Sequence, residues 1–348
     1  MVNAQRDPLA GKIPVTLITG FLGSGKTTLI SKLVRHPAMQ RAAVVINEIG
    51  EIGIDHDLVT MSSENITLLA NGCICCSVRT DLQETLRDLF ARRRVGEIAD
   101  FDRVIVETTG LADPAPVVQT LVSDTLLAAQ YRLDGLVTLV DAVNGAHQIA
   151  HQAEAAKQIA LADRIFSTKS DMAEADAVDE LKAAIEAINR MADVALIVNG
   201  EVHPDALTDL GLSSARSSRA TLSFLGESLS STEAAAERYL GTRPPLHDTA
   251  IKTLSLRFDK PFTWTTFSAA MELLTTLRGP DLLRVKGIVN VDGKPVVVQG
   301  VQHIFHSPVT LDRWPSADTD TRLVFITRNI EADTIRNLLK AVGDVSSL

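Results

Sequence analysis

The chain lacks the segments that mark secreted and membrane proteins. No apolar run approaches the roughly 20 residues needed to span a bilayer, and residues 1–11 are polar, without the apolar core of a signal peptide. Cysteine is also scarce: the three cysteines lie at positions 73, 75 and 76, too close together for a disulfide framework. We therefore expect a cytoplasmic protein with no membrane partner.

Basic residues are in the minority as well. The chain has 34 Lys and Arg against 43 Asp and Glu, and its formal net charge is −9. This balance argues against a nucleic-acid-binding surface. What the chain does have is length and apolar content: 348 residues, 45% of them hydrophobic, are enough for two folded domains with a sizeable core.

Residues 20–28, GFLGSGKTT, match the phosphate-loop pattern G-x-x-x-x-G-K-[ST] in full. An apolar run at 13–19 predicts a buried strand before the loop, and the spacing at 29–34 predicts a helix after it. This strand–loop–helix setting is what a phosphate loop requires, and a plain glycine-rich turn is the weaker interpretation. The fixed positions of the pattern are held by Gly20, Gly25, Lys26 and Thr27.

Such a loop predicts a nucleotide site. Its backbone N–H groups point at phosphate oxygens, and the helix N-terminus adds partial positive charge. We expect Lys26 to reach the β- and γ-phosphates from an open site with no packing role, and Thr27 to ligate Mg²⁺. The loop residues predicted to bind nucleotide are Gly20, Gly23, Ser24, Gly25, Lys26, Thr27 and Thr28.

An acidic segment follows the next apolar run. Residues 47–55, NEIGEIGID, have no clear period and are predicted to form a loop carrying Glu48 and Asp55. Many phosphate-loop GTPases carry a segment that senses the γ-phosphate at this place in the chain. An acidic surface loop is the alternative interpretation.

A second carboxylate ends the strand expected at 104–106. Glu107 is well placed there to hold the Mg²⁺ shell. Gly110, three residues later, could bring a backbone N–H to the γ-phosphate and act as a hinge when that phosphate leaves.

The three cysteines are clustered between a strand expected at 65–70 and an apolar helical stripe. We expect Cys73, Cys75 and Cys76 at or just before a helix N-terminus, where the helix dipole favours the thiolate. Three soft ligands suit Zn²⁺ or Cu(I), with Co²⁺ possible in a tetrahedral site. Because Cys75 and Cys76 are adjacent, a site using two cysteines and other ligands is plausible. Buried structural cysteines and a redox-sensing thiol cluster are the alternatives.

The strand expected at 164–167 leads into Thr168-Lys169-Ser170-Asp171. The carboxylate of Asp171 could accept hydrogen bonds from the N1–H and N2–H₂ groups of guanine, a donor pair that adenine lacks, so it would select GTP. Lys169 could pack its stem across the base.

One pair of histidines, His147 and His151, has the four-residue spacing that puts two side chains on one helix face. Such a pair could bind metal. No third ligand is near in the sequence, so a solvated helix face is the preferred interpretation.

The alternation of expected strands and helices predicts an α/β fold, namely a phosphate-loop NTPase with a doubly wound, mostly parallel sheet. A second unit of strands and helices, with a hairpin around Asp292-Gly293, predicts a smaller α+β domain. We place an N-terminal tail at 1–11, the GTPase domain at 12–210, a linker at 211–248 and the C-terminal domain at 249–348.

Together these motifs resemble those of the CobW-type GTPases (the CobW/HypB/UreG group), relatives of the accessory GTPases that deliver nickel to urease and hydrogenase. The resemblance covers nearly the whole chain. The second domain is similar to the family's C-terminal domain at 284–288 and 298–303. The motifs that carry the resemblance in the first domain are GFLGSGKTT, NEIGEIGID, the C-x-C-C match GCICC, ETTG at 107–110 and the guanine motif at 168–171.

The resemblance implies a GTP-hydrolysing metallochaperone that binds zinc, or else cobalt, at its C-x-C-C site and delivers it to a client metalloprotein. The oligomeric state is open, a homo-oligomer being possible. The assigned ligands of the transition metal are Cys73, Cys75 and Cys76. Glu48 and Asp55 are switch carboxylates near the nucleotide or the metal, with their individual roles left open. The other assigned residues are Thr27 for Mg²⁺, Lys26, Glu107 and Glu48 for catalysis, and Gly110, Thr168, Lys169 and Asp171 for GTP.

Two features depart from the family pattern. Thr168 stands where the family usually has Asn, so one polar contact between the base loop and the phosphate loop is in doubt. The region of the linker offers only His203 and His247 where many members carry a His-rich tract, which argues against a role in metal storage.

Two other functions are considered. One is a redox-controlled regulatory GTPase. The other is a small-molecule kinase, a function that would not explain the cysteines or Asp171.

Overall fold

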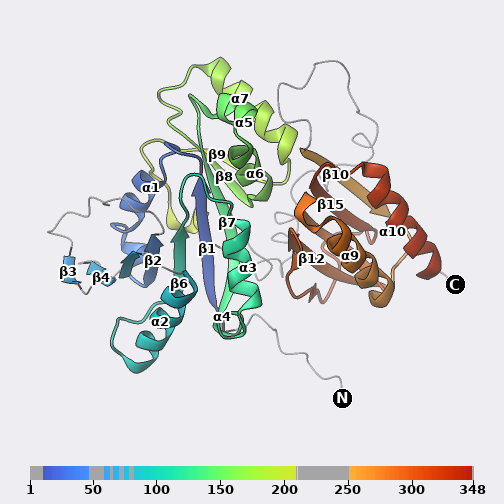
Figure 1. Cartoon of the computed structure of the whole chain (residues 1–348), viewed down its shortest axis with the longest axis horizontal. Coiled ribbons are helices and arrows are strands. Elements are labelled where there is room, and N and C mark those ends of the chain that lie inside the picture. The colour runs from blue at the N-terminus through green and yellow to red at the C-terminus, as the bar shows by residue number, and fades with distance from the viewer. Residues whose placement is uncertain are drawn as a thin grey trace. The chain divides into compact units, whose positions relative to one another are not determined.

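The computed structural model describes residues 11–46, 59–62, 66–69, 74–77, 82–208, 210 and 251–346. The chain forms two compact units, which are drawn together in Figure 1. Both are discontinuous in sequence: the first comprises Met1–Gly145, Ala162–Val178 and Val194–Ser213, and the second comprises Ala146–Leu161, Asp179–Asp193 and Ser214–Leu348. The predicted domain limits stay a prediction.

The first unit is built on one large sheet. Its strands are β1 (Ile13–Gly20), β2 (Ala42–Ile46), β3 (Val59–Ser62), β4 (Ile66–Leu69), β5 (Ile74–Ser77), β6 (Arg103–Glu107), β7 (Tyr131–Asp141), β8 (Arg164–Thr168) and β9 (Asp193–Leu196), in the order β3-β4-β5-β2-β6-β1-β7-β8-β9. All neighbours from β5 to β8 run parallel, whereas β3, β4 and β5 pair antiparallel. The predicted mostly parallel sheet is therefore confirmed.

Helix packing explains why the central strands are apolar on both faces. Helix α1 (Lys26–Leu33) buries Leu29, Ile30 and Leu33 against residues of β1, β2, β6, β7 and β8. Helix α3 (Ala115–Ser123) contacts β7. The other helical segments up to residue 208 are η1 (Pro37–Met39), α2 (Leu82–Val95), α4 (Thr125–Gln130), α5 (Gly145–His151), α6 (Ala153–Leu161), α7 (Ala175–Ile188) and η3 (Pro204–Leu207).

One local prediction is wrong. Cys75 and Cys76 lie within β5 rather than at a helix N-terminus, and α2 begins only at Leu82. The free edge of β2 pairs with this segment in parallel, and that long-range pairing outweighs the helical pattern that follows. Helix α3 is followed at once by α4, because the side chain of Asp124 accepts hydrogen bonds from the amides of Leu126 and Leu127 and caps the start of α4.

The second unit contains the predicted α+β arrangement. Its strands are β10 (Ile251–Phe258), β11 (Leu282–Val291), β12 (Lys294–Val301), β13 (Ile304–Phe305), β14 (Val309–Thr310) and β15 (Thr321–Arg328), with sheet order β10-β15-β11-β12-β13 and β14 paired to β12. The predicted hairpin is confirmed: Asp292 and Gly293 both have positive φ, as the turn between β11 and β12 requires.

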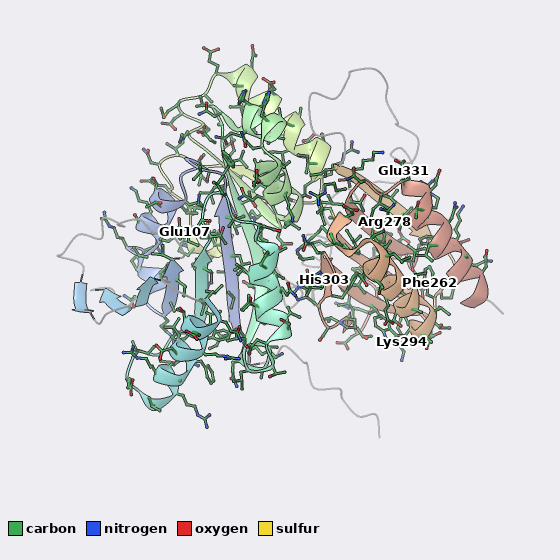
Figure 2. The ribbon with its side chains drawn as sticks, viewed as in Figure 1. Glu107, Phe262, Arg278, Lys294, His303 and Glu331 are labelled. Atoms are coloured by element: carbon green, nitrogen blue, oxygen red, sulfur yellow. The ribbon has the colours of Figure 1, made fainter. Side chains whose placement is uncertain are left out.

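The core of the second unit lies between its sheet and two helices. Helix α9 (Trp264–Arg278) and helix α10 (Ala332–Ser346) contribute Phe267, Leu274, Ile335 and Leu339 to an apolar cluster with the strands. Phe262, labelled in Figure 2, sits in this cluster at 1% exposure. A short helix η6 (Gly279–Asp281) links α9 to β11. Within the described part of the chain, no helix combines the length and apolarity needed to cross a bilayer.

Gly287 offers a test of this packing. A Cβ built on it would lie 2.3 Å from the carbonyl oxygen of Arg322, which is backbone and cannot swing away. We expect Gly287→Ala to lower the free energy of unfolding by about 1–3 kcal/mol in urea titrations of the full chain.

Gly343→Ala in α10 is the control. A Cβ at Gly343 would meet the ring of Phe262 at 3.4 Å, an ordinary contact, so this substitution should raise the free energy of unfolding by up to about 1 kcal/mol. An unchanged midpoint for Gly287→Ala would contradict the close approach of β11 to β15.

Candidate functional site

The phosphate loop follows β1 and runs directly into α1. Gly23 and Gly25 take left-handed φ values of 75° and 91°, which side chains rarely tolerate. A Cβ at Gly20 would lie 2.4 Å from the carbonyl oxygen of Leu139, so only glycine lets β1 end this close to β7. The loop closes with a hydrogen bond from the Ser24 amide to the Phe21 carbonyl, 3.1 Å.

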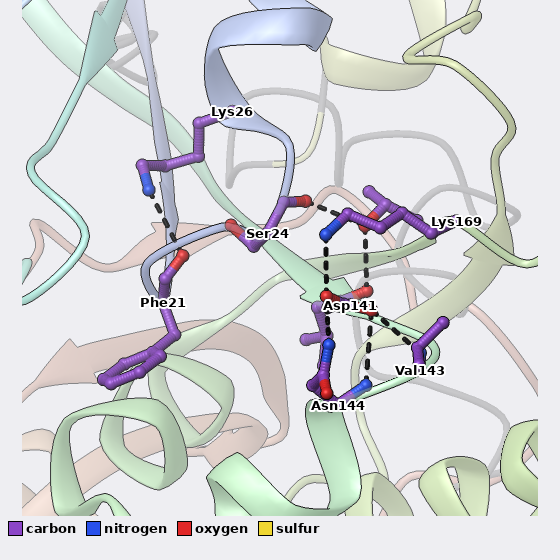
Figure 3. A network of polar contacts seen from close by, with 9 residues as sticks. Phe21, Ser24, Lys26, Asp141, Val143, Asn144 and Lys169 are labelled. Atoms are coloured by element: carbon purple, nitrogen blue, oxygen red, sulfur yellow. Dashed lines mark hydrogen bonds and ion pairs between the residues drawn. The ribbon is translucent and has the colours of Figure 1, made fainter. Parts of the chain in front are cut away.

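Lys26 differs from the expectation. Its side chain is buried, at 5% exposure, and its ammonium donates to the Gly20 carbonyl at 2.9 Å. It also donates to the Phe21 carbonyl at 3.4 Å, a contact drawn in Figure 3. The prediction of an open site without a packing role is therefore wrong, because the loop curls around the first turn of α1 and turns its own carbonyls toward the ammonium. Thr27 and Thr28, on the same turn, are exposed.

The segment from Glu107 to Gly110 packs against the phosphate loop. Glu107 ends β6 between β1 and β2, is 1% exposed and is labelled in Figure 2. The next residue, Thr108, donates its amide to the Ile18 carbonyl at 2.9 Å. A Cβ at Gly110 would lie 3.0 Å from both N and Cα of Leu22. The structure thus brings together the two segments that the sequence assigns to phosphate and Mg²⁺.

The predicted base loop, residues 168–171, is tied to the phosphate loop by Thr168. Its hydroxyl, buried at the end of β8, donates to the Ser24 carbonyl at 2.8 Å and also lies 3.3 Å from the Val140 carbonyl. The contact that the missing Asn put in doubt is therefore made by a hydroxyl. Lys169 follows in a left-handed conformation with φ 57°, and Asp171 is exposed beside it.

Sequence reasoning missed two contributors to this end of the sheet. Asp141, at the end of β7, is 1% exposed and forms an ion pair with Lys169 at 2.8 Å. The Asn199-Gly200 turn after β9 packs on α1, since a Cβ at Gly200 would lie 2.9 Å from the backbone of Leu29. The Asn-Gly pair is a visible turn signal, but its partner helix is set by the tertiary fold.

The predicted metal ligands are only partly described. Cys73, Glu48 and Asp55 lie outside the described residues. The backbones of Cys75 and Cys76 pair with Val44 and Val45 of β2, which is itself the neighbour of β6. Elsewhere among the described residues, no group of three or more His, Cys, Asp and Glu side chains could hold a metal ion.

The histidine pair on α5 is exposed. The rings of His147 and His151 stack with centroids 4.1 Å apart, and Nδ1 of His151 lies 2.8 Å from the His147 carbonyl. Because a carbonyl oxygen only accepts, Nδ1 is the donor. The described residues supply no third ligand to this pair, as a solvated helix face requires.

Comparison with known proteins matches both parts of the chain. The CobW/HypB/UreG nucleotide-binding domain model matches residues 14–195, and the cobalamin synthesis protein cobW C-terminal domain model matches residues 251–343. The zinc chaperone YjiA of Escherichia coli is 35% identical over 332 residues, covering 93% of this chain and 96% of the relative. The zinc-regulated GTPase metalloprotein activator 1 of Saccharomyces cerevisiae is 27% identical over 368 residues, covering 94% and 83%.

The fold is matched by a solved structure over almost its full length. The crystal structure of Zn(II)-bound YjiA GTPase from Escherichia coli superposes with a TM-score of 0.72 at 32% identity, covering 95% of this chain and 99% of that one.

The Thr168 contact predicts a measurable effect on nucleotide affinity. Thr168→Val keeps the shape of the side chain but removes the donor to the Ser24 carbonyl. Losing about 1 kcal/mol of hydrogen bonding should weaken binding of a GTP analogue roughly fivefold in calorimetric titration.

Thr16→Val is the matched control, because the Thr16 hydroxyl donates to the Leu207 carbonyl at 3.0 Å in an equally buried setting outside the site. Thr16→Val should lower the free energy of unfolding by a similar amount and leave the dissociation constant of the GTP analogue unchanged. Equal losses of affinity in the two variants would show that Thr168 has no special role in the loop.

Proposed function

Because this chain belongs to the CobW/HypB/UreG family of GTPases, we propose that it captures zinc at its cysteine cluster and hands the metal to a client protein under the control of GTP. The protein is a GTPase with the fold of that family. The names of its relatives, a zinc chaperone and a metalloprotein activator, support zinc as cargo and a metalloprotein as client. Cobalt is the second candidate metal, because a sulfur-rich tetrahedral site also suits Co²⁺.

One observation supports a link between metal and nucleotide: strands that carry residues proposed for the two sites belong to one sheet. Strand β5, which holds Cys75 and Cys76, pairs with β2, and β2 pairs with β6, which ends in Glu107. At about 4.8 Å between neighbouring strands, the cysteine strand lies roughly 10 Å from β6. The segment after β6 in turn packs on the phosphate loop through Gly110. A structural change caused by loss of the γ-phosphate would therefore have to cross only a short distance to reach the cysteines.

The residues around the loop support phosphoryl transfer. On nucleotide binding, Lys26 would exchange the carbonyls of Gly20 and Phe21 for β- and γ-phosphate oxygens. Thr27 and Glu107 offer the hard oxygen atoms that Mg²⁺ prefers, and the ion when bound neutralises phosphate charge. Glu107 or Glu48 would orient the attacking water. We further propose that GTP hydrolysis is slow until a client protein docks, and that hydrolysis then loosens the cysteine site.

Base selection is assigned to Asp171. Asp171→Asn replaces one acceptor by a donor, so it should erode the preference for GTP over ATP in competition binding. It should also improve binding of a xanthosine nucleotide, whose carbonyl at C2 accepts the new amide donor. Asp176→Asn, the same change at an exposed site in the first turn of α7, is the control and should alter neither. Equal affinity of the unmodified protein for ATP and GTP would refute the assignment of residues 168–171.

The decisive experiment measures zinc affinity in different nucleotide states. With a competing chelator, zinc should bind more tightly with a GTP analogue than with GDP, by about 5- to 150-fold for typical couplings of ~1–3 kcal/mol. By linkage, the analogue must bind more tightly to zinc-loaded protein by the same factor. The double substitution Cys75→Ser and Cys76→Ser should abolish zinc binding and the coupling while sparing nucleotide binding, since hydroxyls are poor ligands for soft metals.

The control for this experiment is the exposed pair on α5: His147→Ala with His151→Ala should leave the tight zinc site and its coupling intact. Tight zinc binding with the same affinity in every nucleotide state would indicate that the metal is structural. Failure of the reduced protein to bind zinc at all would favour the redox-controlled GTPase instead.

A further inference from the structure

We propose that Asp141 is a positioning residue for guanine recognition, which holds Lys169 so that the base loop keeps its shape. The proposal rests on the assignment of residues 168–171 to the base, made above. It adds a residue from the end of β7, outside the base-loop motif, to the determinants of nucleotide choice.

The two oxygens of Asp141 serve different partners (Figure 3). Oδ1 accepts the backbone amides of Val143 at 2.8 Å and Asn144 at 3.3 Å, which shapes the turn between β7 and α5. Oδ2 accepts the ammonium of Lys169 at 2.8 Å and the side-chain amide of Asn144 at 3.0 Å. One oxygen therefore builds the turn and the other fixes the lysine.

The environment keeps this carboxylate charged. Burial by itself raises the pKa of Asp141, but hydrogen bonds from Lys169, Asn144 and the Val143 amide outweigh it, so the pKa lies below its ordinary value of 3.8. Its side chain is 2% exposed, whereas that of Lys169 is 36% exposed. A buried carboxylate strongly favours keeping its cationic partner, because an unpaired charge in this position is costly. Lys169 is thus anchored at its head while its side chain as a whole stays partly exposed.

The anchored lysine controls the residue that reads the base. Lys169 has φ 57°, a left-handed conformation that is unfavourable for a non-glycine residue and persists only where its surroundings enforce it. Thr168 fixes the chain on one side, and the Asp141 ion pair fixes it on the other. The Lys169 carbonyl then accepts the amide of Met172 at 3.0 Å, closing the turn that carries Asp171. Releasing the ammonium would free both the lysine stem and this turn.

This arrangement separates base affinity from phosphate chemistry. In the described structure the charge of Lys169 is matched by Asp141 rather than aimed at the phosphate loop, whose own lysine is Lys26. Loss of the ion pair should consequently weaken GTP binding and lower the preference for GTP over ATP, without slowing hydrolysis of bound GTP.

Asp141→Asn tests the proposal selectively. Asparagine retains an oxygen for the turn amides but replaces the charged acceptor for Lys169 with a neutral amide. We expect the ratio of GTP to ATP affinity to fall about tenfold, as for loss of one charge-assisted hydrogen bond. The KM for GTP should rise by a similar factor, and kcat at saturation should stay within about twofold.

Two further variants make the result decisive. Asp134→Asn is the matched control: Asp134 lies on the same strand, is equally buried and pairs with Arg132 at 2.9 Å, yet it sits toward the other end of β7, so the GTP-to-ATP ratio should not change. Lys169→Met should reproduce the fall in the ratio, and adding Asp141→Asn to it should lower the ratio no further, because Asp141 acts through Lys169.

Several outcomes would overturn the proposal. These are an unchanged GTP-to-ATP ratio in Asp141→Asn, equal losses for both nucleotides, or additive effects in the double variant. If Asp141→Asn does not fold, Lys169→Met decides alone, and an unchanged ratio there refutes the role of the ion pair. If the unmodified protein itself fails to prefer GTP, the base-site assignment falls first, and that failure is seen before any variant is made.

Discussion

The site depends on how closely the phosphate loop approaches the strand ends around it. Gly20 ends β1 where a Cβ would collide with the Leu139 carbonyl, and Gly110 lies against the backbone of Leu22. Gly200 meets the first turn of α1 in the same manner. These contacts are made by backbone, which has few ways to yield, so the loop is held from several sides at once. A loop fixed in this way presents its amides to phosphate with little reorganisation.

The strand order places the phosphate loop between two groups of strands whose residues have different proposed roles. On one side of β1 lie β6, β2 and β5, which lead to Glu107 and to the cysteines; on the other side lie β7 and β8, which lead to Asp141 and the base loop. The residues proposed to read the base therefore lie on one flank, and the cysteines proposed to hold the metal lie on the other. The phosphate loop, in the middle, contacts both flanks directly, through Gly110 and through Thr168.

Two buried charged groups in this region, Lys26 and Asp141, have hydrogen-bond partners that replace water. Lys26 is buried against two carbonyls of its own loop, and Asp141 is buried against one ammonium and three N–H donors. Desolvating a charge is costly unless hydrogen bonds replace its water. The two groups meet this requirement differently. The partners of Lys26 are carbonyls that phosphate oxygens can replace, whereas Asp141 is committed to its turn and its lysine. The first is suited to ligand exchange and the second to fixed geometry.

The sequence alone determined the features that depend on local pattern. The phosphate loop, the buried parallel strands and the hairpin at Asp292-Gly293 follow from residue spacing and from the φ values that glycine permits. The tertiary structure decided whatever depends on partners distant in the chain. Cys75 and Cys76 are in a strand because the edge of β2 is available, and Lys26 is buried because its loop curls around it. Thr168 replaces an expected Asn because the Ser24 carbonyl lies within reach of its hydroxyl. Asp141 carries no local signal at all. Its role appears only when β7 and β8 bring it to Lys169, 28 residues away in the sequence, because an ion pair is set by distance in space rather than by position along the chain.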